Sequence, residues 1–291
     1  MKINYNEKIE KIDAALDRFI PDNSDLAPII YESMRYSVFA GGKRLRPLLL
    51  MAAAEALGKK GEDYLNIACG MEMIHTYSLI HDDLPAMDND DYRRGKLTNH
   101  KVYDEAIAIL AGDALLTLAF EVMLEQKNVA VQTLLDVVKD IARAAGPAGM
   151  VGGQVLDMES EGKNIELDKL QLMHNAKTGA LFTAAIKAGG ILAGANKEQL
   201  AMLVSFSEFY GLAFQITDDI LDAIGDQEKI GKPVGSDEKN NKATFVTLYS
   251  VEEAKIMAQD AVNKAINCLT DFGTNADLLK SFAEKLLLRD K

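Results

Sequence analysis

The placement of proline constrains this chain more than any other feature. Six prolines occur in 291 residues, and none lies between Pro147 and Pro233. Proline breaks a helix because its ring removes a backbone hydrogen-bond donor and clashes with the preceding turn. The proline-free stretches are rich in Ala, Leu, Met, Glu and Lys, which favour helix, while alternating β-branched residues are scarce. The sequence therefore predicts an all-α protein.

Apolar residues recur at helical spacing along most of the chain, as at Ile9, Ile12 and Leu16. We predict helices over residues 5–20, 26–39, 48–57, 62–84, 102–125, 128–145, 167–192, 197–223, 251–270 and 276–289. The stretches 102–118 and 176–195 are apolar on nearly every face, which is typical of helices in the centre of a large bundle. About ten or more helices around one core are the simplest interpretation.

No linker, low-complexity segment or fixed-period repeat divides the chain, so we predict a single domain over residues 1–291. The formal net charge of −12 excludes non-specific binding to nucleic acid or to an anionic membrane. Cys69 and Cys268 lie far apart and indicate neither a metal site nor a disulfide framework. The N-terminus lacks a signal core, and no apolar run reaches the length of a membrane span. We therefore expect a cytoplasmic protein without membrane insertion.

An acidic cluster follows the predicted helix 62–84, with five aspartates in ten residues. Pro85 disfavours helix at the residue before it, so Asp82 and Asp83 should lie in the last turn. There they face the negative end of the helix dipole and repel each other by up to ~4 kcal/mol. Arg93, Arg94 or a divalent metal ion could offset this repulsion. A solvated acidic loop would also explain the cluster.

A second acidic cluster ends the predicted helix 197–223. Asp218 and Asp222 are four residues apart and share a helix face with Gln215, while Asp219 is displaced by about a quarter turn. Carboxylate, water and phosphate oxygens are the ligands that Mg²⁺ prefers. Two such clusters that face each other would hold Mg²⁺ ions around a diphosphate. A solvated helix face is the alternative for this cluster alone.

A basic segment provides cations for an anionic substrate. Two glycines, which let the backbone approach a ligand, precede Lys43, Arg44 and Arg46. Arginine binds phosphate bidentately. His75, two helical turns before Asp82, could donate to a phosphate as well. The alternatives are a basic turn between helices and a core histidine.

Two further lysines are candidates for phosphate binding. Lys177, followed by Thr178, lies among apolar residues and should be partly buried, which favours an anionic partner. Lys232 lies in a glycine-containing segment that could close over phosphate or could be an ordinary surface loop. Gln154 and Asp157 share a helix face, but their spacing indicates no particular function.

These motifs occur together in one known family. They are GGKRLRP at 41–47, DDLPAMD at 82–88, RRG at 93–95, GGQVLD at 152–157, KTGAL at 177–181, FQITDDILD at 214–222 and GKPVGSD at 231–237. From about residue 30 to its end, the chain resembles the trans-prenyltransferases, the polyprenyl diphosphate synthase family. It is most similar to the bacterial farnesyl diphosphate synthases.

The resemblance implies an all-α barrel of about ten helices around a deep cavity, usually as a homodimer. It implies about three Mg²⁺ ions that bridge an allylic diphosphate to aspartates, namely Asp82, Asp88 and Asp218, with Asp83, Asp219 and Asp222 nearby. That diphosphate would also bind Arg93, Lys177 and Lys232. Isopentenyl diphosphate would bind Lys43, Arg46, His75 and Arg94, with the backbone of Gly42.

The resemblance also implies a reaction. The diphosphate group of the allylic substrate leaves, and an allylic cation remains. This cation is stabilised by the Thr178 hydroxyl, the Lys177 carbonyl and Gln215. The alkene of isopentenyl diphosphate attacks that cation, and the released diphosphate takes the proton, since no side-chain base stands out.

Tyr77, with Ser78 one turn before Asp82, would form the floor of the cavity. Together with the four residues between Asp83 and Asp88, this position resembles enzymes that stop at a fifteen-carbon product, which implies (2E,6E)-farnesyl diphosphate. A ten- or twenty-carbon product, a terpene cyclase and a non-catalytic subunit of a heteromeric synthase are the alternatives. Plain helix packing is the alternative role for Tyr77.

Overall fold

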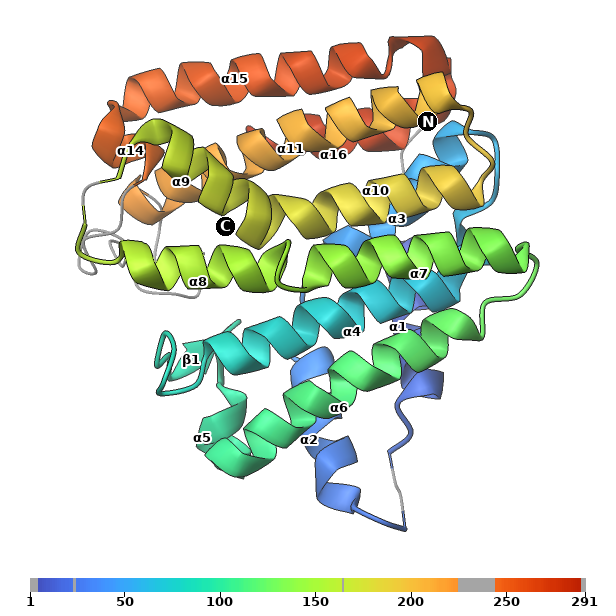
Figure 1. The fold of residues 1–291 in the computed structure, drawn as a ribbon, viewed down its shortest axis with the longest axis vertical. Helices are drawn as coiled ribbons and strands as arrows, with labels where there is room; N and C mark the ends of the chain where they lie inside the picture. Colours follow the sequence, from blue (N-terminus) through green and yellow to red (C-terminus); the bar gives the residue numbers. More distant parts are fainter. Residues whose placement is uncertain (1–4, 23–24, 164, 225–243, 289–291) are drawn as a thin grey trace. The chain divides into compact units, whose positions relative to one another are not determined.

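The structure, a computed structural model, describes residues 5–22, 25–163, 165–224 and 244–288 (Figure 1). The regular elements in these ranges are helices, apart from one antiparallel hairpin of two-residue strands, β1 (Tyr92–Arg93) and β2 (Lys96–Leu97). The prediction of an all-α protein is confirmed.

The chain groups into two compact units, which are described separately. Unit 1 comprises Met1–Met51 and Glu62–Val138, and unit 2 comprises Ala52–Gly61 and Lys139–Lys291. The single domain over residues 1–291 stays a prediction.

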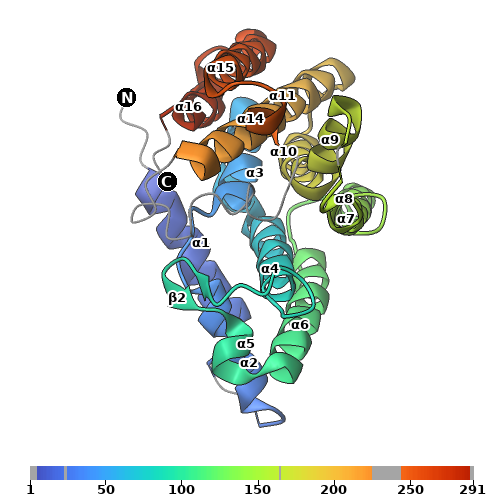
Figure 2. The same cartoon turned by 90° about the vertical axis from the view of Figure 1, so that its left-hand side faces the viewer.

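Unit 1 is built around a pair of long helices. Its helices are α1 (Tyr5–Phe19), α2 (Pro28–Val38), the first part of α3 (Leu45–Ala56), η1 (Gly61–Tyr64), α4 (Leu65–Asp82), α5 (Asn99–Tyr103), α6 (Glu105–Leu124) and the first part of α7 (Val131–Ala145). Figure 2 shows α4 beside α6. The pair is close because glycines lie at the contact. A Cβ added to Gly112 of α6 would lie 2.5 Å from Cδ2 of His81 on α4.

The end of α4 follows the sequence prediction. The helix stops at Asp82, and Asp83 is its C-cap residue. Beyond it the backbone folds back, because the Asp88 N–H donates to the Asp82 carbonyl over 2.9 Å. The acidic segment is therefore a compact turn attached to the end of a buried helix.

Unit 2 contains the second group of helices. They are α8 (Met150–Ser160), α9 (Leu167–His174), the π-helix η2 (Asn175–Gly179), α10 (Ala180–Leu192), α11 (Lys197–Ile224), α14 (Phe245–Leu248), α15 (Val251–Cys268), η3 (Thr270–Ala276) and α16 (Asp277–Leu286). In Figure 1, α11 and α15 run side by side. Ile216 of α11, Phe245 of α14 and Ala254 of α15 form a common core.

Two helices that the sequence predicts as continuous are interrupted. The helix expected over 167–192 contains the π-helical turn η2, and such turns are frequent at functional sites. The helix expected over 102–125 is split at Asp104, which has a φ of 71° and caps α6 by accepting from Ile107 N–H over 3.0 Å. Asp is a favoured N-cap residue, so this boundary has a sequence signal.

By length and composition, α6 and α11 are apolar enough to cross a membrane. The statement that no apolar run reaches a span's length is therefore corrected. Core helices meet the same criterion, and α6 packs on α4 while α11 packs on α15. The absence of membrane insertion stays a prediction.

Candidate functional site

The predicted site residues lie in both units. The first aspartate cluster and the predicted isopentenyl diphosphate ligands belong to unit 1. The second cluster, Lys177 and Thr178 belong to unit 2. Lys232 lies outside the described residues. That the two clusters face each other stays a prediction.

Asp83 and Arg93 are partners of each other. Asp83 is 3% exposed, and Arg93 Nε donates to its two carboxylate oxygens over 2.7 and 2.8 Å. Burial lowers the pKa of Arg93, but the hydrogen bond and charge of Asp83 outweigh it and hold that pKa above its ordinary value. The pair fastens the hairpin that begins with β1 to the end of α4. Asp82, by contrast, is half-buried and Asp88 is exposed.

The cations of the basic segment differ in burial, because the backbone turns one of them into the protein. Gly41, Gly42 and Arg44 all have positive φ, of 101°, 133° and 48°. This backbone turns Arg44 inward, where it is 3% exposed. Lys43 stays exposed, and Arg46 is half-buried in the first turn of α3. Of the three cations in this segment, Arg44 is therefore the one that is buried.

Arg94 closes over the glycines of this segment. Its Nη1 donates to the Gly41 carbonyl. A Cβ added to Gly42 would lie 2.5 Å from that same nitrogen, so only glycine fits there. Burial lowers the pKa of Arg94, and so do the neighbouring charges of Arg44 and Arg93, against the charge of Glu72. The structure thus brings Gly42 and Arg94 into contact.

His75 lies in the field of the same arginines. Burial, followed by the charges of Arg46, Arg94, Arg93 and Arg44, lowers its pKa well below 6.5. The imidazole is therefore neutral at neutral pH and offers one N–H donor. Within unit 1, His75, Arg46 and Arg94 thus form one electrostatic cluster.

The residues predicted to limit product length are held in α4. Ser78 Oγ donates to the His75 carbonyl over 2.9 Å. Tyr77 is 7% exposed, and its ring lies edge-on to His81 at 5.6 Å. His81 Nε2 lies 3.0 Å from the Ile109 carbonyl of α6. Burial raises the pKa of Tyr77, so the phenol is protonated.

In unit 2 the π-helix η2 is held by α8. Lys177 Nζ donates to Oδ2 of Asp157 over 2.6 Å, and Asp157 is 9% exposed. A Cβ added to Gly153 would lie 2.6 Å from Lys177 Cα. The expected anionic partner of Lys177 is therefore Asp157, whose role the sequence did not indicate. Thr178 follows in the same turn and is half-buried.

The second aspartate pair repeats the division seen in the first. Asp219 is 4% exposed, and its carboxylate accepts from Gln215 Nε2 over 2.8 Å and from Phe245 N–H over 2.7 Å. It therefore joins α11 to the start of α14. Asp218 is exposed and Asp222 is half-buried. In each pair, one carboxylate is buried in structural hydrogen bonds and the other is accessible.

Among the residues described, no three His, Cys, Asp or Glu side chains gather into a metal-binding group. The accessible carboxylates nevertheless fit Mg²⁺. Asp82 and Asp88 on one unit, and Asp218 and Asp222 on the other, provide oxygen donors only. Mg²⁺ is usually held by one or two carboxylates together with substrate phosphates rather than by a complete protein cage.

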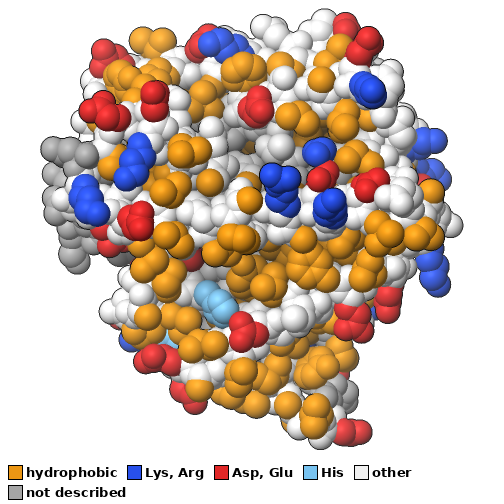
Figure 3. Space-filling view, in the orientation of Figure 1, with side chains coloured by type: hydrophobic (Ala, Val, Ile, Leu, Met, Phe, Trp, Pro, Cys, Tyr) orange, Lys and Arg blue, Asp and Glu red, His pale blue; other side chains and the backbone are white. Residues whose placement is uncertain are grey.

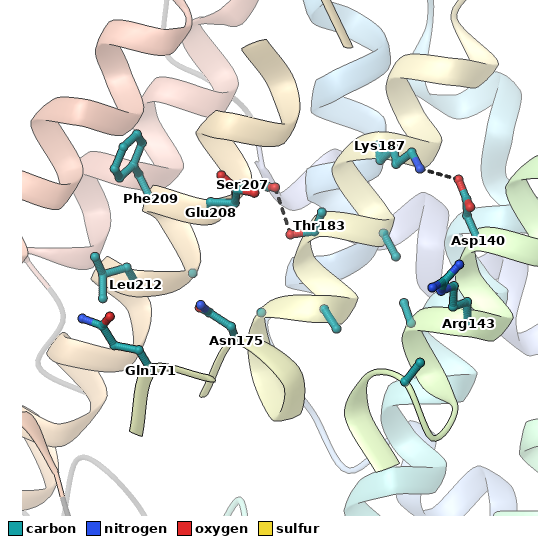
Figure 4. A pocket seen from close by; sticks show the side chains of 16 residues that line it. Asp140, Arg143, Gln171, Asn175, Thr183, Lys187, Ser207, Glu208, Phe209 and Leu212 are labelled. Carbon is teal, nitrogen blue, oxygen red and sulfur yellow. Dashed lines mark hydrogen bonds and ion pairs between the residues drawn. The ribbon is translucent and has the colours of Figure 1, made fainter. Parts of the chain in front are cut away.

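A surface pocket of about 520 Å³ lies in unit 2 (Figure 4). No predicted site residue lines it. Four of its polar residues form two pairs, Lys187 with Asp140 over 2.6 Å and Ser207 with Thr183 over 2.9 Å. This pocket is therefore not the candidate site.

The chain is similar to known proteins over nearly its whole length. The model of the polyprenyl synthetase family matches residues 27–284. A farnesyl diphosphate synthase of Geobacillus stearothermophilus is 47% identical over 287 residues, covering 98% of this chain and 96% of that protein. A geranylgeranyl diphosphate synthase of Cyanophora paradoxa is 45% identical over 298 residues, covering 100% and 99%. The solved apo FPP/GFPP synthase of Zymomonas mobilis has a TM-score of 0.87 and 39% identity, covering 98% of this chain and 100% of that one.

Proposed function

Because the chain belongs to the polyprenyl synthetase family, we propose that it condenses an allylic diphosphate with isopentenyl diphosphate, head to tail. Dimethylallyl and geranyl diphosphate are the allylic substrates, and (2E,6E)-farnesyl diphosphate and diphosphate are the products. One observation supports this most. His75 lies in the field of four arginines, and the acidic turn begins two turns further along the same helix, in the same unit.

The arginine cluster suits the diphosphate that does not leave. Arg46, Arg94 and the exposed Lys43 bind it through charge, and the His75 N–H donates without adding a charge. Gly42 lets its backbone approach the phosphate. Such a site would hold isopentenyl diphosphate through side chains and backbone rather than through carboxylate-bound metal ions, so its diphosphate would not be activated as a leaving group.

The accessible aspartates suit the diphosphate that leaves. Asp82, Asp88, Asp218 and Asp222 would hold Mg²⁺, about three ions per active site. The metal supplies neutralisation of the charge that develops on the departing group. Asp83 and Asp219 would support these ligands without being the main metal ligands, because their carboxylates already accept hydrogen bonds.

The π-helix η2 carries groups that would stabilise the allylic substrate as it ionises. Lys177 contributes its charge to the allylic diphosphate, as do Arg93 and Lys232 in the sequence prediction. The Thr178 hydroxyl and the Lys177 carbonyl direct partial negative charge at the allylic cation. Gln215 donates its amide to Asp219, so its carbonyl oxygen is turned towards the opposite side. The proton lost from the condensed product goes to the released diphosphate.

The length of the product tests the proposed function. The purified protein is incubated with Mg²⁺, dimethylallyl diphosphate and labelled isopentenyl diphosphate, and the product is sized. A fifteen-carbon product supports the proposal, and a ten- or twenty-carbon product supports a geranyl or geranylgeranyl diphosphate synthase instead. Replacing Tyr77 with alanine should lengthen the product, and an unchanged length would refute its role as the floor.

Two other functions remain as alternatives. A terpene cyclase would cyclise the allylic diphosphate without using isopentenyl diphosphate, and the cluster around His75 argues against it. A non-catalytic subunit would show no condensation on its own, and the accessible aspartates argue against that.

We also propose a cytoplasmic homodimer that binds neither nucleic acid nor membrane. Large apolar side chains are exposed on α5 and α6 of unit 1, namely Val102, Ile109, Leu110 and Leu124. Figure 3 shows apolar side chains gathered over the region where α6 runs. Exposed patches of this kind mark protein interfaces. Light scattering that gives the mass of one chain would refute the dimer.

A further inference from the structure

Arg44 is fully occupied inside unit 1. Its Nε donates to Asp13 over 2.7 Å, its Nη1 to Glu72 over 3.0 Å and its Nη2 to the Val38 carbonyl over 2.8 Å. Arg44 and Glu72 side chains are 3% and 2% exposed. The guanidinium therefore joins three helices, since Asp13 lies on α1, Val38 on α2 and Glu72 on α4.

This junction lies within the segment that carries the predicted ligands of isopentenyl diphosphate. Lys43 precedes Arg44 directly, and Arg46 follows two residues later. Glu72 is three residues before His75, so the two share a face of α4. The junction thus attaches the basic segment to α4 one turn from His75.

The backbone of the segment depends on this attachment. Gly41 and Gly42 adopt positive φ readily, but at Arg44 a φ of 48° is strained for a residue with a side chain. Such a conformation persists only where surrounding contacts enforce it. The three hydrogen bonds of the guanidinium provide those contacts, and they keep the Gly41 carbonyl where Arg94 reaches it.

We infer that Arg44, held by Glu72 and Asp13, is a positioning residue that sets the spacing of Lys43, Arg46, Arg94 and His75 for a substrate diphosphate it does not itself touch. This inference rests on the proposed function. It assigns the middle cation of the segment to the affinity for isopentenyl diphosphate alone, and not to the allylic substrate.

The test is Arg44→Lys, which keeps the charge but has one nitrogen in place of the three that reach Asp13, Glu72 and the Val38 carbonyl. The KM for isopentenyl diphosphate should rise about 10-fold or more, while the KM for the allylic substrate stays within about 2-fold. Titration of the protein with isopentenyl diphosphate alone should show the same loss of affinity.

A matched control is Arg35→Lys in α2 of the same unit. Arg35 also donates to an aspartate, Asp17, over 2.6 Å, and its guanidinium lies over the Phe39 ring. Both partners lie outside the basic segment. Its substitution should leave both KM values within about 2-fold. If Arg44→Lys is too unstable to purify, Asp13→Asn removes one of its partners at a side chain that is 40% exposed. It should raise the KM for isopentenyl diphosphate by about 3-fold.

Three outcomes separate the inference from the function. A wild-type protein that does not condense the substrates refutes the proposed function. A wild-type protein that condenses them, with variants that raise both KM values equally, refutes the inference alone. Variants that lower thermal stability without changing either KM refute it as well.

Discussion

Lys177 Nζ and Asp157 Oδ2 lie 2.6 Å apart, and this ion pair joins the π-helix η2 to α8. A lysine that is proposed to bind a diphosphate is thus already oriented by a buried carboxylate. The diphosphate would meet a cation whose side chain is fixed in direction before binding, so less conformational entropy is lost.

The first prediction concerns this pair. Asp157→Asn should lower kcat/KM for the allylic substrate by about 10-fold and leave the KM for isopentenyl diphosphate within about 2-fold. The reason is that Lys177 loses the partner that orients it. Steady-state kinetics with each substrate varied separately measure both values.

Asp140→Asn provides the control for that variant. Asp140 forms an ion pair of the same length with Lys187 in the same unit, and this pair joins α7 to α10 rather than to η2. Its loss should leave both kinetic constants unchanged. Equal effects of the two substitutions would contradict the orienting role of Asp157.

The second prediction concerns the close contact at Gly153. Gly153→Ala places a methyl group against the Lys177 backbone, and overpacking of this kind costs about 1–3 kcal/mol. We expect a lower free energy of unfolding together with lower activity. Gly179→Ala, where the nearest atom to an added Cβ is 3.7 Å away, should change stability far less. Denaturant unfolding of both variants compares them, and similar losses would argue against the contact.

The third prediction separates Asp218 from Asp219. Asp219→Asn leaves one carbonyl oxygen where two carboxylate oxygens accepted, so it should lower stability by about 1–3 kcal/mol. Asp218→Asn should leave stability nearly unchanged because Asp218 is exposed. It should lower turnover by orders of magnitude because Asp218 is a proposed Mg²⁺ ligand. Thermal unfolding and turnover are measured on both proteins. A large stability loss in Asp218→Asn would overturn this division of roles.

The fourth prediction concerns pH and His174. Burial lowers the pKa of His174 to about 4, from an ordinary value of 6.5, and the charge of Lys177 adds to the effect against that of Asp157. Above pH 6.5 the folded and unfolded states are both neutral at this residue. Between pH 6.5 and 4 only the unfolded state is protonated, so stability falls as the pH falls.

The expected loss is on the order of 3 kcal/mol by pH 4. His174→Phe cannot titrate, so its stability should depend less on pH across this window. Unfolding in denaturant between pH 7 and 4.5 gives the two slopes. Identical slopes would show that another group causes the dependence.

The sequence predicted the helices because apolar spacing is a local property. Most helix ends lie within a few residues of the predicted ones, as with Asp82 at the end of α4. The turn at Asn175–Gly179 was missed since its apolar residues continue the helical pattern. The hairpin was missed because its two-residue loop, Arg94-Gly95, lacks the usual Asn-Gly or Asp-Gly signal.

The partners of the site residues could not be predicted from the sequence. Spacing showed that Lys43, Arg44 and Arg46 are near one another, but not that Arg44 alone turns inward. That direction depends on Asp13 and Glu72, which are distant in sequence. Likewise, nothing local indicated that Asp83 pairs with Arg93 or that Asp219 accepts from Phe245 N–H.

The ring of His81 is half-buried and contacts Tyr77 on its own helix and Gly112 and the Ile109 carbonyl on α6. The residue next to it is Asp82. A smaller residue at Tyr77, introduced to make room for a longer product, therefore removes one of the contacts that hold the His81 ring and the end of α4. Variants at Tyr77 that make longer products should therefore have a lower kcat. A second substitution that replaces the lost contact with His81 should raise kcat again.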